Sequence, residues 1–192
     1  MASENTRERI LEASLRLFSD RGYDAVGVQE IADVCSVTKP ALYYYFSSKS
    51  GILEGIMQEY VDPFINLLEK AVADSKGVVN TVTNFCYCYV ENACKNMPLS
   101  MMLMSMQYAP LRSESYQVFR RHCSKIFEIA ISIFEKSGNE LGNMNGRQRQ
   151  FATTLLGMLG YHMYELVILD NPALDKREVD QLIHQFLHGI YS

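Results

Sequence analysis

Hydrophobic side chains recur at intervals of three and four residues along most of the chain, the spacing of helices with one buried face. The pattern predicts helices over Thr6–Arg21, Val28–Val34, Thr38–Phe46, Val78–Lys95, Met97–Pro110, Ser113–Ser137, Arg147–Leu169 and Lys176–Ile190. A further helix, the fourth in order, follows Ser47, and its apolar stripe runs from Ile52 to Leu68. No stretch of useful length alternates between apolar and polar residues as a half-buried strand does. The sequence therefore predicts an all-α fold of about nine helices.

Residues that start, end or interrupt helices separate these segments. Gly22 follows the first helix and suits a terminating position with positive φ. Ser47 is the expected N-cap of the fourth helix, and Pro63 is expected to kink it because proline removes a backbone hydrogen bond. Gly138–Gly146, rich in glycine and asparagine, is expected to be a loop.

The stretch from Val28 to Lys49 has the pattern of two short helices joined by a tight turn. Cys35–Val37 gives a three-residue connection, a length that helix-turn-helix motifs use. Thr38 is a suitable N-cap for the second helix, and Pro40 lies in its first turn, where a missing N–H costs little. The alternative is a helical hairpin that serves only to build the core.

The outer surface of this second helix is expected to be aromatic and basic. Leu42 and Phe46 lie four residues apart and are expected to anchor the helix. Three consecutive tyrosines, Tyr43–Tyr45, cannot share one buried side, because successive helical residues are about 100° apart. The chain has no acidic residue between Thr38 and Ser50. The expected core of residues 1–50 consists of Leu11, Leu17, Phe18, Ile31, Leu42 and Phe46.

A longer series of residues carries a family resemblance. It comprises Thr6, Arg7, Ile10, Leu11, Ala13, Leu17, Phe18, Gly22, Tyr23, Val26, Val28, Ile31, Ala32, Val37, Thr38, Pro40, Leu42, Tyr43, Tyr45, Phe46, Lys49 and Leu53. In order and spacing, these residues resemble the N-terminal domain of the TetR family of transcriptional regulators. Gly27 stands where that family usually has Thr or Ser, and Cys35-Ser36 where it usually has Ala-Gly. Gly27 lacks a hydroxyl for a phosphate, and Ser36 is strained if its φ is positive.

The resemblance implies a ligand-responsive DNA-binding regulator, most simply a repressor released from a palindromic operator by an apolar or aromatic small molecule. It implies a helix-turn-helix domain over residues 1–50 and a ligand-binding and dimerisation domain over residues 51–192. A homodimer would form through Arg147–Leu169 and Lys176–Ile190. The residues expected at double-stranded DNA are Val28, Thr38, Lys39, Pro40, Ala41, Tyr43, Tyr44, Tyr45 and Lys49. Lys39 and Ala41 are placed to read bases, and Lys49 to reach a phosphate.

Composition narrows how this domain would bind DNA. The 192-residue chain has 48% hydrophobic and 21% charged residues, which is typical of a globular protein. Its formal net charge is −4, and residues 1–50 hold six basic and seven acidic residues. Affinity for DNA must therefore come from where the basic groups lie.

Cysteines and the chain start indicate a cytoplasmic location. The chain has five cysteines, and no two of them are separated by two intervening residues. This pattern suits a reducing compartment better than a disulfide framework. The charged N-terminal residues lack the apolar core of a signal peptide. Phe151–Leu169 has the length of a membrane span but contains His162 and Glu165, so a buried helix is expected and no membrane association.

The body carries no ligand motif, but its methionines and tyrosines suit an adaptable apolar pocket. The candidate ligand-binding residues are Tyr87, Tyr89, Met101, Met104, Tyr108, Tyr161, His162 and Glu165. The alternative is a methionine-rich core in which His162 is a satisfied core group.

Catalytic chemistry has little support in the sequence. The four histidines are scattered, and no glycine-rich phosphate loop is present. We expect no enzyme activity, no cofactor and no metal. The competing function is a thiol-based redox sensor that binds DNA and uses Cys86, Cys88, Cys94 or Cys123.

Overall fold

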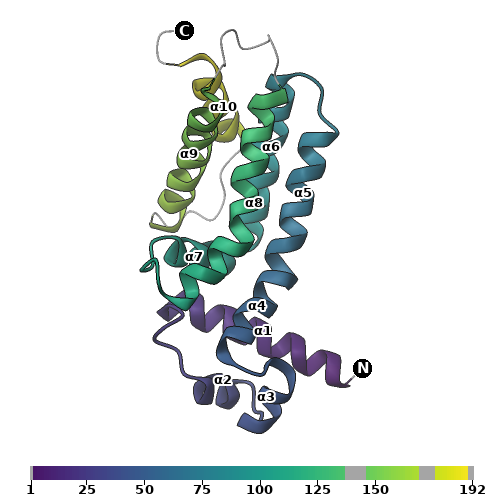
Figure 1. Ribbon diagram of the computed structural model, residues 1–192, viewed down its shortest axis with the longest axis vertical. Helices are drawn as coiled ribbons and strands as arrows, with labels where there is room; N and C mark the ends of the chain where they lie inside the picture. The colour runs from purple at the N-terminus through teal and green to yellow at the C-terminus, as the bar shows by residue number, and fades with distance from the viewer. Residues whose placement is uncertain (1, 137–145, 169–175, 190–192) are drawn as a thin grey trace. The chain divides into compact units, whose positions relative to one another are not determined.

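The computed structural model describes residues 2–136, 146–168 and 176–189, and these residues confirm the all-α prediction (Figure 1). They form ten α-helices and one π-helical turn. The elements are α1 (Ala2–Arg21), α2 (Val28–Val34), α3 (Lys39–Phe46), α4 (Lys49–Ile56), η1 (Met57–Val61), α5 (Asp62–Ala73), α6 (Val78–Lys95), α7 (Met97–Gln107), α8 (Glu114–Lys136), α9 (Gln148–Ile168) and α10 (Lys176–His188). Most of the predicted loop Gly138–Gly146, and the predicted helix ends Ser137, Leu169 and Ile190, lie outside the described residues.

The tenth helix arises because the predicted fourth helix, which follows Ser47, is not continuous. α4 ends at Ile56, the π-helical turn η1 follows, and α5 begins at Asp62, one residue before Pro63. In a regular α-helix the proline ring would clash with the carbonyl four residues earlier. The wider π-helical turn ends at Val61, two residues before the proline, so the helix is interrupted close to where the sequence predicts a kink.

The N-cap of α4 also differs from the prediction by one residue. Ser48 caps the helix, because its Oγ accepts a hydrogen bond of 2.9 Å from the Gly51 N–H. Ser47 instead lies in the turn after α3 with a φ of 57°. Positive φ is unusual for a serine, so the turn rather than the residue type sets this conformation.

The chain divides into two compact units. Unit 1 comprises residues 1–63 and 98–123, and unit 2 comprises residues 64–97 and 124–192. In unit 1, α1 contacts α2 and α4, and α3 contacts α2 and α4. The largest fully buried side chains of unit 1 are Ile10, Leu11, Phe18, Ile31, Leu42, Ile52, Leu53, Ile56 and Met57. Leu17, predicted in this core, is half-buried, and Leu15 is buried instead because it lies on the same helix face as Leu11 and Phe18.

The first part of α8 is fastened to unit 1 by a histidine between two carboxylates. His122 Nδ1 lies 2.8 Å from Asp62 Oδ1, and His122 Nε2 lies 2.8 Å from Glu54 Oε2. Arg121 pairs with the other Glu54 oxygen. An ionised carboxylate only accepts hydrogen bonds, so both ring nitrogens must carry a proton for both bonds to form. The geometry therefore favours the charged imidazolium form of His122.

This clamp predicts that stability falls with rising pH. Burial opposes the charge on His122, but the hydrogen bonds to Asp62 and Glu54 outweigh burial and raise its pKa above the ordinary value. A raised folded-state pKa contributes stability that is complete below the unfolded pKa of about 6.5 and is lost as pH rises through the folded value. Urea unfolding between about pH 5.5 and pH 8.5 is expected to show this loss. The slope is expected to flatten in His122→Gln, and an identical slope in the two proteins would contradict the clamp.

In unit 2, α6 contacts α9 and α10. The Phe134 ring lies 5.7 Å from Phe151 and 6.1 Å from Phe186, so α8, α9 and α10 share an aromatic cluster. The buried face of α9 consists of Ala152, Leu155, Leu159, Met163 and Leu166. Tyr161 and Tyr164 on α9 are 62% and 46% exposed, so the expected burial of this helix is incomplete within the single chain. Among the residues that the structure describes, no helix combines the length and the hydropathy required to cross a membrane.

Candidate nucleic-acid interface and effector pocket

The turn between α2 and α3 has the compact form that the sequence predicts. The Val37 N–H donates to the Ala32 carbonyl at 2.9 Å, and the Cys35 N–H donates to the Ile31 carbonyl at 3.0 Å. Ser36 has a φ of 51°, the condition under which strain was expected at this position. A non-glycine residue in this region costs on the order of 1 kcal/mol. Burial of Cys35, which is 3% exposed, fastens the turn to the core.

The N-termini of α2 and α3 are capped differently. The Thr38 Oγ1 accepts a hydrogen bond of 3.3 Å from the Ala41 N–H, which confirms Thr38 as the N-cap of α3. Gly27 precedes Val28 with φ −90° and ψ 150° but has no side chain to cap α2. Free backbone N–H groups and the helix dipole make a helix N-terminus favourable for phosphate.

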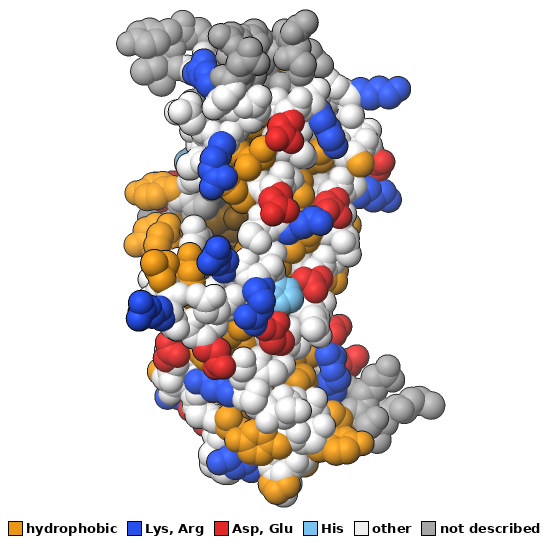
Figure 2. Space-filling view, in the orientation of Figure 1, with side chains coloured by type: hydrophobic (Ala, Val, Ile, Leu, Met, Phe, Trp, Pro, Cys, Tyr) orange, Lys and Arg blue, Asp and Glu red, His pale blue; other side chains and the backbone are white. Residues whose placement is uncertain are grey.

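The outer face of α3 is aromatic and basic, as the sequence predicts. Leu42 and Phe46 are buried and hold the helix on the core. Tyr43 is 39% exposed and Tyr44 is 84% exposed, so these two tyrosines are not core filler. Thr38, Lys39 and Pro40 are also exposed, and Ala41 and Tyr45 are half-buried. Figure 2 shows hydrophobic side chains, together with a basic one, over the end of unit 1 that carries α2 and α3.

Lys49, the first residue of α4, lies in a more enclosed place than Lys39. Its Nζ is 4.2 Å from the ring centroid of Tyr23, and the side chain is half-buried. Burial lowers the pKa of Lys49, and the negative charges of Asp24 and Glu114 oppose that shift. The Tyr23 hydroxyl donates a hydrogen bond to Glu114. Sequence reasoning missed this group because Glu114 lies 91 residues beyond Tyr23.

The residues predicted to bind a ligand do not share one environment. In unit 2, the Tyr87 hydroxyl donates to Asp180 of α10, and the Tyr89 ring lies 5.8 Å from Phe64. His162 Nδ1 lies 3.0 Å from Glu165 Oε2 on the same helix, next to the exposed Tyr161. In unit 1, Met101 and Met104 are half-buried, and Tyr108 is 83% exposed.

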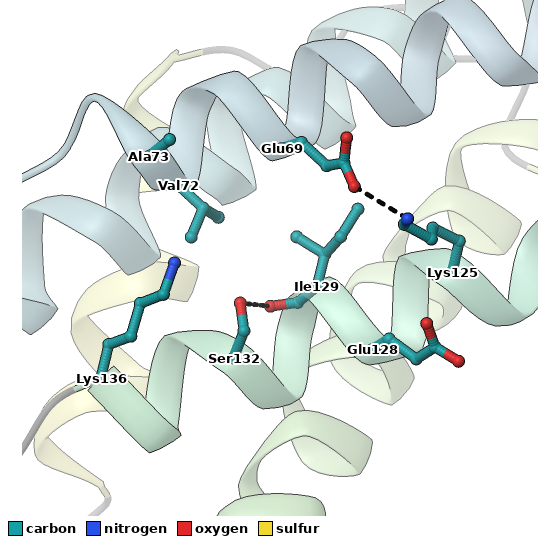
Figure 3. A pocket seen from close by; sticks show the side chains of 8 residues that line it. All are labelled: Glu69, Val72, Ala73, Lys125, Glu128, Ile129, Ser132 and Lys136. Carbon is teal, nitrogen blue, oxygen red and sulfur yellow. Dashed lines mark hydrogen bonds and ion pairs between the residues drawn. The ribbon is translucent and has the colours of Figure 1, made fainter.

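A pocket that the sequence did not predict lies between α5 and α8 in unit 2 (Figure 3). It has a volume of about 350 Å³ and is lined by Glu69, Val72, Ala73, Lys125, Glu128, Ile129, Ser132 and Lys136. Lys125 Nζ pairs with Glu69 Oε1 at 3.2 Å at one end, and Lys136 lies near Val72 at the other. Charged groups thus border an apolar strip formed by Val72, Ala73 and Ile129.

The cysteine environments count against thiol-based sensing at three positions. All five cysteines are free, and Cys86 and Cys123 are buried. Burial raises the pKa of Cys86 to about 12 and that of Cys123 to about 12. Burial, followed by the charge of Glu91, also raises the pKa of Cys88. Thiol oxidation and exchange proceed through the thiolate, so these three thiols are poorly reactive at neutral pH.

Comparison with known proteins places the helix-turn-helix in a family. Residues 10–56 match the family model described as "Bacterial regulatory proteins, tetR family". This part of the chain is a tetR-family helix-turn-helix domain, as its residues led us to expect. The transcriptional activator FasR of Mycolicibacterium smegmatis is 39% identical over 92 residues, which are 46% of this chain and 42% of FasR. The match thus spans less than half of that relative's length.

Solved structures share the fold over nearly the whole chain. FadR from Bacillus subtilis, in complex with stearoyl-CoA, has a TM-score of 0.81 at 16% identity, and the match covers 96% of this chain and 99% of FadR. AibR, in complex with isovaleryl coenzyme A and operator DNA, has a TM-score of 0.76 at 22% identity over 95% of this chain and 98% of AibR. At these identities the similarity establishes the all-helical fold alone.

Proposed function

We propose that the protein is a homodimeric transcription regulator of the cytoplasm that binds a palindromic operator and leaves it when a small molecule binds the body. The observation that carries this proposal is the exposed, acid-free face of α3, held by a capped helix-turn-helix of the tetR family. Residues 1–50 would bind DNA, and residues 51–192 would hold the effector and the dimer interface. The relative FasR is named as a transcriptional activator, so whether this protein represses or activates transcription must be measured directly.

In this proposal, α3 enters the major groove with its N-terminal residues toward the base edges. Lys39 can donate to guanine acceptors, and the Ala41 methyl can pack on a thymine methyl. The tyrosine hydroxyls and the N-termini of α2 and α3 would contact phosphates and fix the register. Because residues 1–50 carry no excess of positive charge, two such surfaces in one dimer are needed for useful affinity.

The dimer is proposed to form through α9 and α10. Tyr161 and Tyr164 leave an aromatic surface on α9 opposite its buried face. At Gly157 and Gly160 an added Cβ would meet no atom within 4 Å, so a second helix has room to approach closely. The family resemblance supports the same pair of helices.

The effector is proposed to be an acyl-coenzyme A thioester. FadR and AibR, which share the fold, carry stearoyl-CoA and isovaleryl coenzyme A respectively. The pocket between α5 and α8 offers Lys125 and Lys136 for an anionic group beside an apolar strip. Its volume of about 350 Å³ is at the small end for ligand sites, so it would hold only part of such a molecule. The predicted tyrosine and methionine residues remain candidates for the rest.

The function is tested by selecting duplexes from a random DNA library with the full chain and then titrating the bound complex with thioesters. We expect enrichment of two inverted half-sites and release of the DNA by stearoyl-CoA or isovaleryl-CoA but not by coenzyme A alone. No enriched duplex would contradict the DNA-binding function. Enrichment of single half-sites would contradict the dimer, and binding that is indifferent to both thioesters would contradict the proposed effector class.

A further inference from the structure

Tyr23, Glu114 and Lys49 form a connected group within unit 1. The Tyr23 side chain is buried, and its ring meets Phe18 edge-on at 5.1 Å between centroids. Its hydroxyl donates to Glu114, the first residue of α8, and Lys49 Nζ lies 4.2 Å from its ring centroid. Phe18 and the Glu114 carboxylate thus fix the Tyr23 ring. The face of this ring contacts Lys49, which is predicted to contact DNA.

The raised pKa of Tyr23 keeps its hydroxyl available as a hydrogen-bond donor at neutral pH. Burial, followed by the hydrogen bond to Glu114, raises the pKa of the Tyr23 phenol. The hydroxyl therefore stays protonated and donates a hydrogen bond to the carboxylate of Glu114. A hydrogen bond to an ionised acceptor is among the stronger ones that proteins make.

The charges around Lys49 disfavour a phosphate at its present position. Asp24 and Glu114 both act on the Lys49 ammonium, and the tyrosine face adds a cation–π contact. A phosphate that approached the ammonium here would be repelled by both carboxylates. Lys49 can pair with DNA at full strength only after it turns away from Glu114.

We propose that Glu114 is a positioning residue for DNA binding, which acts through Tyr23 to hold Lys49 on the tyrosine ring and withhold it from the DNA backbone. This inference rests on the proposed DNA-binding function. Glu114 begins α8, and the same helix supplies Lys125, Ile129, Ser132 and Lys136 to the pocket. A displacement of α8 by a ligand would therefore change the hold on Lys49.

Four single variants test the proposal by fluorescence anisotropy on a selected duplex. Glu114→Gln removes the charge, Tyr23→Phe removes the hydroxyl but keeps the ring, and Lys49→Met removes the ammonium. Glu12→Gln makes the same charge change at another exposed position of unit 1 and serves as the control. Glu114→Gln and Tyr23→Phe are each expected to tighten binding about threefold, without adding to each other. The slope of log K against log salt is expected to steepen by about 1.8, because each protomer of the dimer gains one phosphate contact worth about 0.9.

The Lys49→Met background decides whether the effect passes through this lysine. In that background Glu114→Gln is expected to leave affinity unchanged. If Glu114→Gln still raises DNA affinity in the Lys49→Met background, or if Glu12→Gln raises affinity equally, the gain comes from the overall change in net charge. Either result would overturn the proposal. Unchanged or weaker binding by Glu114→Gln in the parent would overturn it as well.

A measurement without DNA separates this inference from the proposed function. With 13C-methylated lysines, NMR titration is expected to show a lower Lys49 pKa in Glu114→Gln than in the parent, because the supporting negative charge is gone, and no change in Glu12→Gln. An unchanged Lys49 pKa in Glu114→Gln would overturn the contact. Failure of the parent to enrich any duplex would overturn the proposed function, while this titration would still decide whether Glu114 holds Lys49.

Discussion

Gly51→Ala is expected to lower the free energy of unfolding of unit 1 by about 3 kcal/mol or more, at the upper end for an overpacked site. A Cβ at Gly51 would lie 1.9 Å from the Phe46 carbonyl oxygen and 3.0 Å from its carbonyl carbon. Both are backbone atoms, so no change of rotamer relieves the contact. Either α3 or α4 must move.

Neither helix can move cheaply. Phe46 is 6% exposed and ends α3 in the core. Ser47, with a φ of 57°, makes the turn, and the Ser48 cap on the Gly51 N–H fixes the start of α4. Separating the helices would withdraw Leu42 and Phe46, both on α3, from Leu11 and the other buried side chains of unit 1. The damage would reach Lys49, the first residue of α4.

Urea unfolding followed by circular dichroism measures this effect, and other glycines provide controls. At Gly27, φ is −90° and an added Cβ would meet no atom within 4 Å, so Gly27→Ala is expected to cost at most about 1 kcal/mol as a weaker N-cap. At Gly55 the nearest atoms are side-chain carbons of Phe46 at 2.9 Å and Leu11 at 3.0 Å, which can yield, so an intermediate loss is expected. Equal stability of Gly51→Ala and Gly27→Ala would contradict the close turn between α3 and α4.

Sequence reasoning succeeded where local rules decide the structure. The capped start of α3 and the anchoring pair Leu42 and Phe46 each depend on residues within one or two turns. Helix periodicity then distinguishes the buried side of α3 from its outer face. These features were enough to predict the helix-turn-helix and that Tyr43–Tyr45 could not all be buried. They did not show that Tyr45 would be half-buried while Tyr43 and Tyr44 are exposed.

Two kinds of feature were not predicted from the sequence. The first is a contact between residues that lie far apart in the chain, and the second is a helix face that could equally line a pocket or face solvent. Glu114 reaches Tyr23 across 91 residues, and no local pattern marks that pair. Lys125, Ile129, Ser132 and Lys136 follow helical spacing, but a lysine-bearing helix face resembles an ordinary solvated surface until α5 lies beside it. Pro63 signalled an interruption, yet no local rule specified that it would take the form of a π-helical turn.

Tyr43→Ala is expected to weaken operator binding about 100-fold or more while leaving the fold intact. Tyr43 is 39% exposed on α3, next to the buried anchor Leu42, so truncation removes a surface ring and leaves the core unchanged. A lost DNA contact costs about 1–3 kcal/mol, and a dimer on a palindromic site loses it twice. Since each 1.4 kcal/mol is tenfold, the two losses together account for the expected change.

The matched control is Tyr108→Ala, which truncates another exposed tyrosine of unit 1, 83% exposed and outside the helix-turn-helix. Fluorescence anisotropy on the selected duplex is expected to show weaker DNA binding for Tyr43→Ala than for Tyr108→Ala. In urea unfolding, both variants are expected to have the same midpoint as the parent protein. A Tyr43→Ala protein that binds as tightly as Tyr108→Ala would mean that α3 does not present this face to DNA. Lower stability in Tyr43→Ala alone would mean that the ring belongs to the core, against its exposure in the structure.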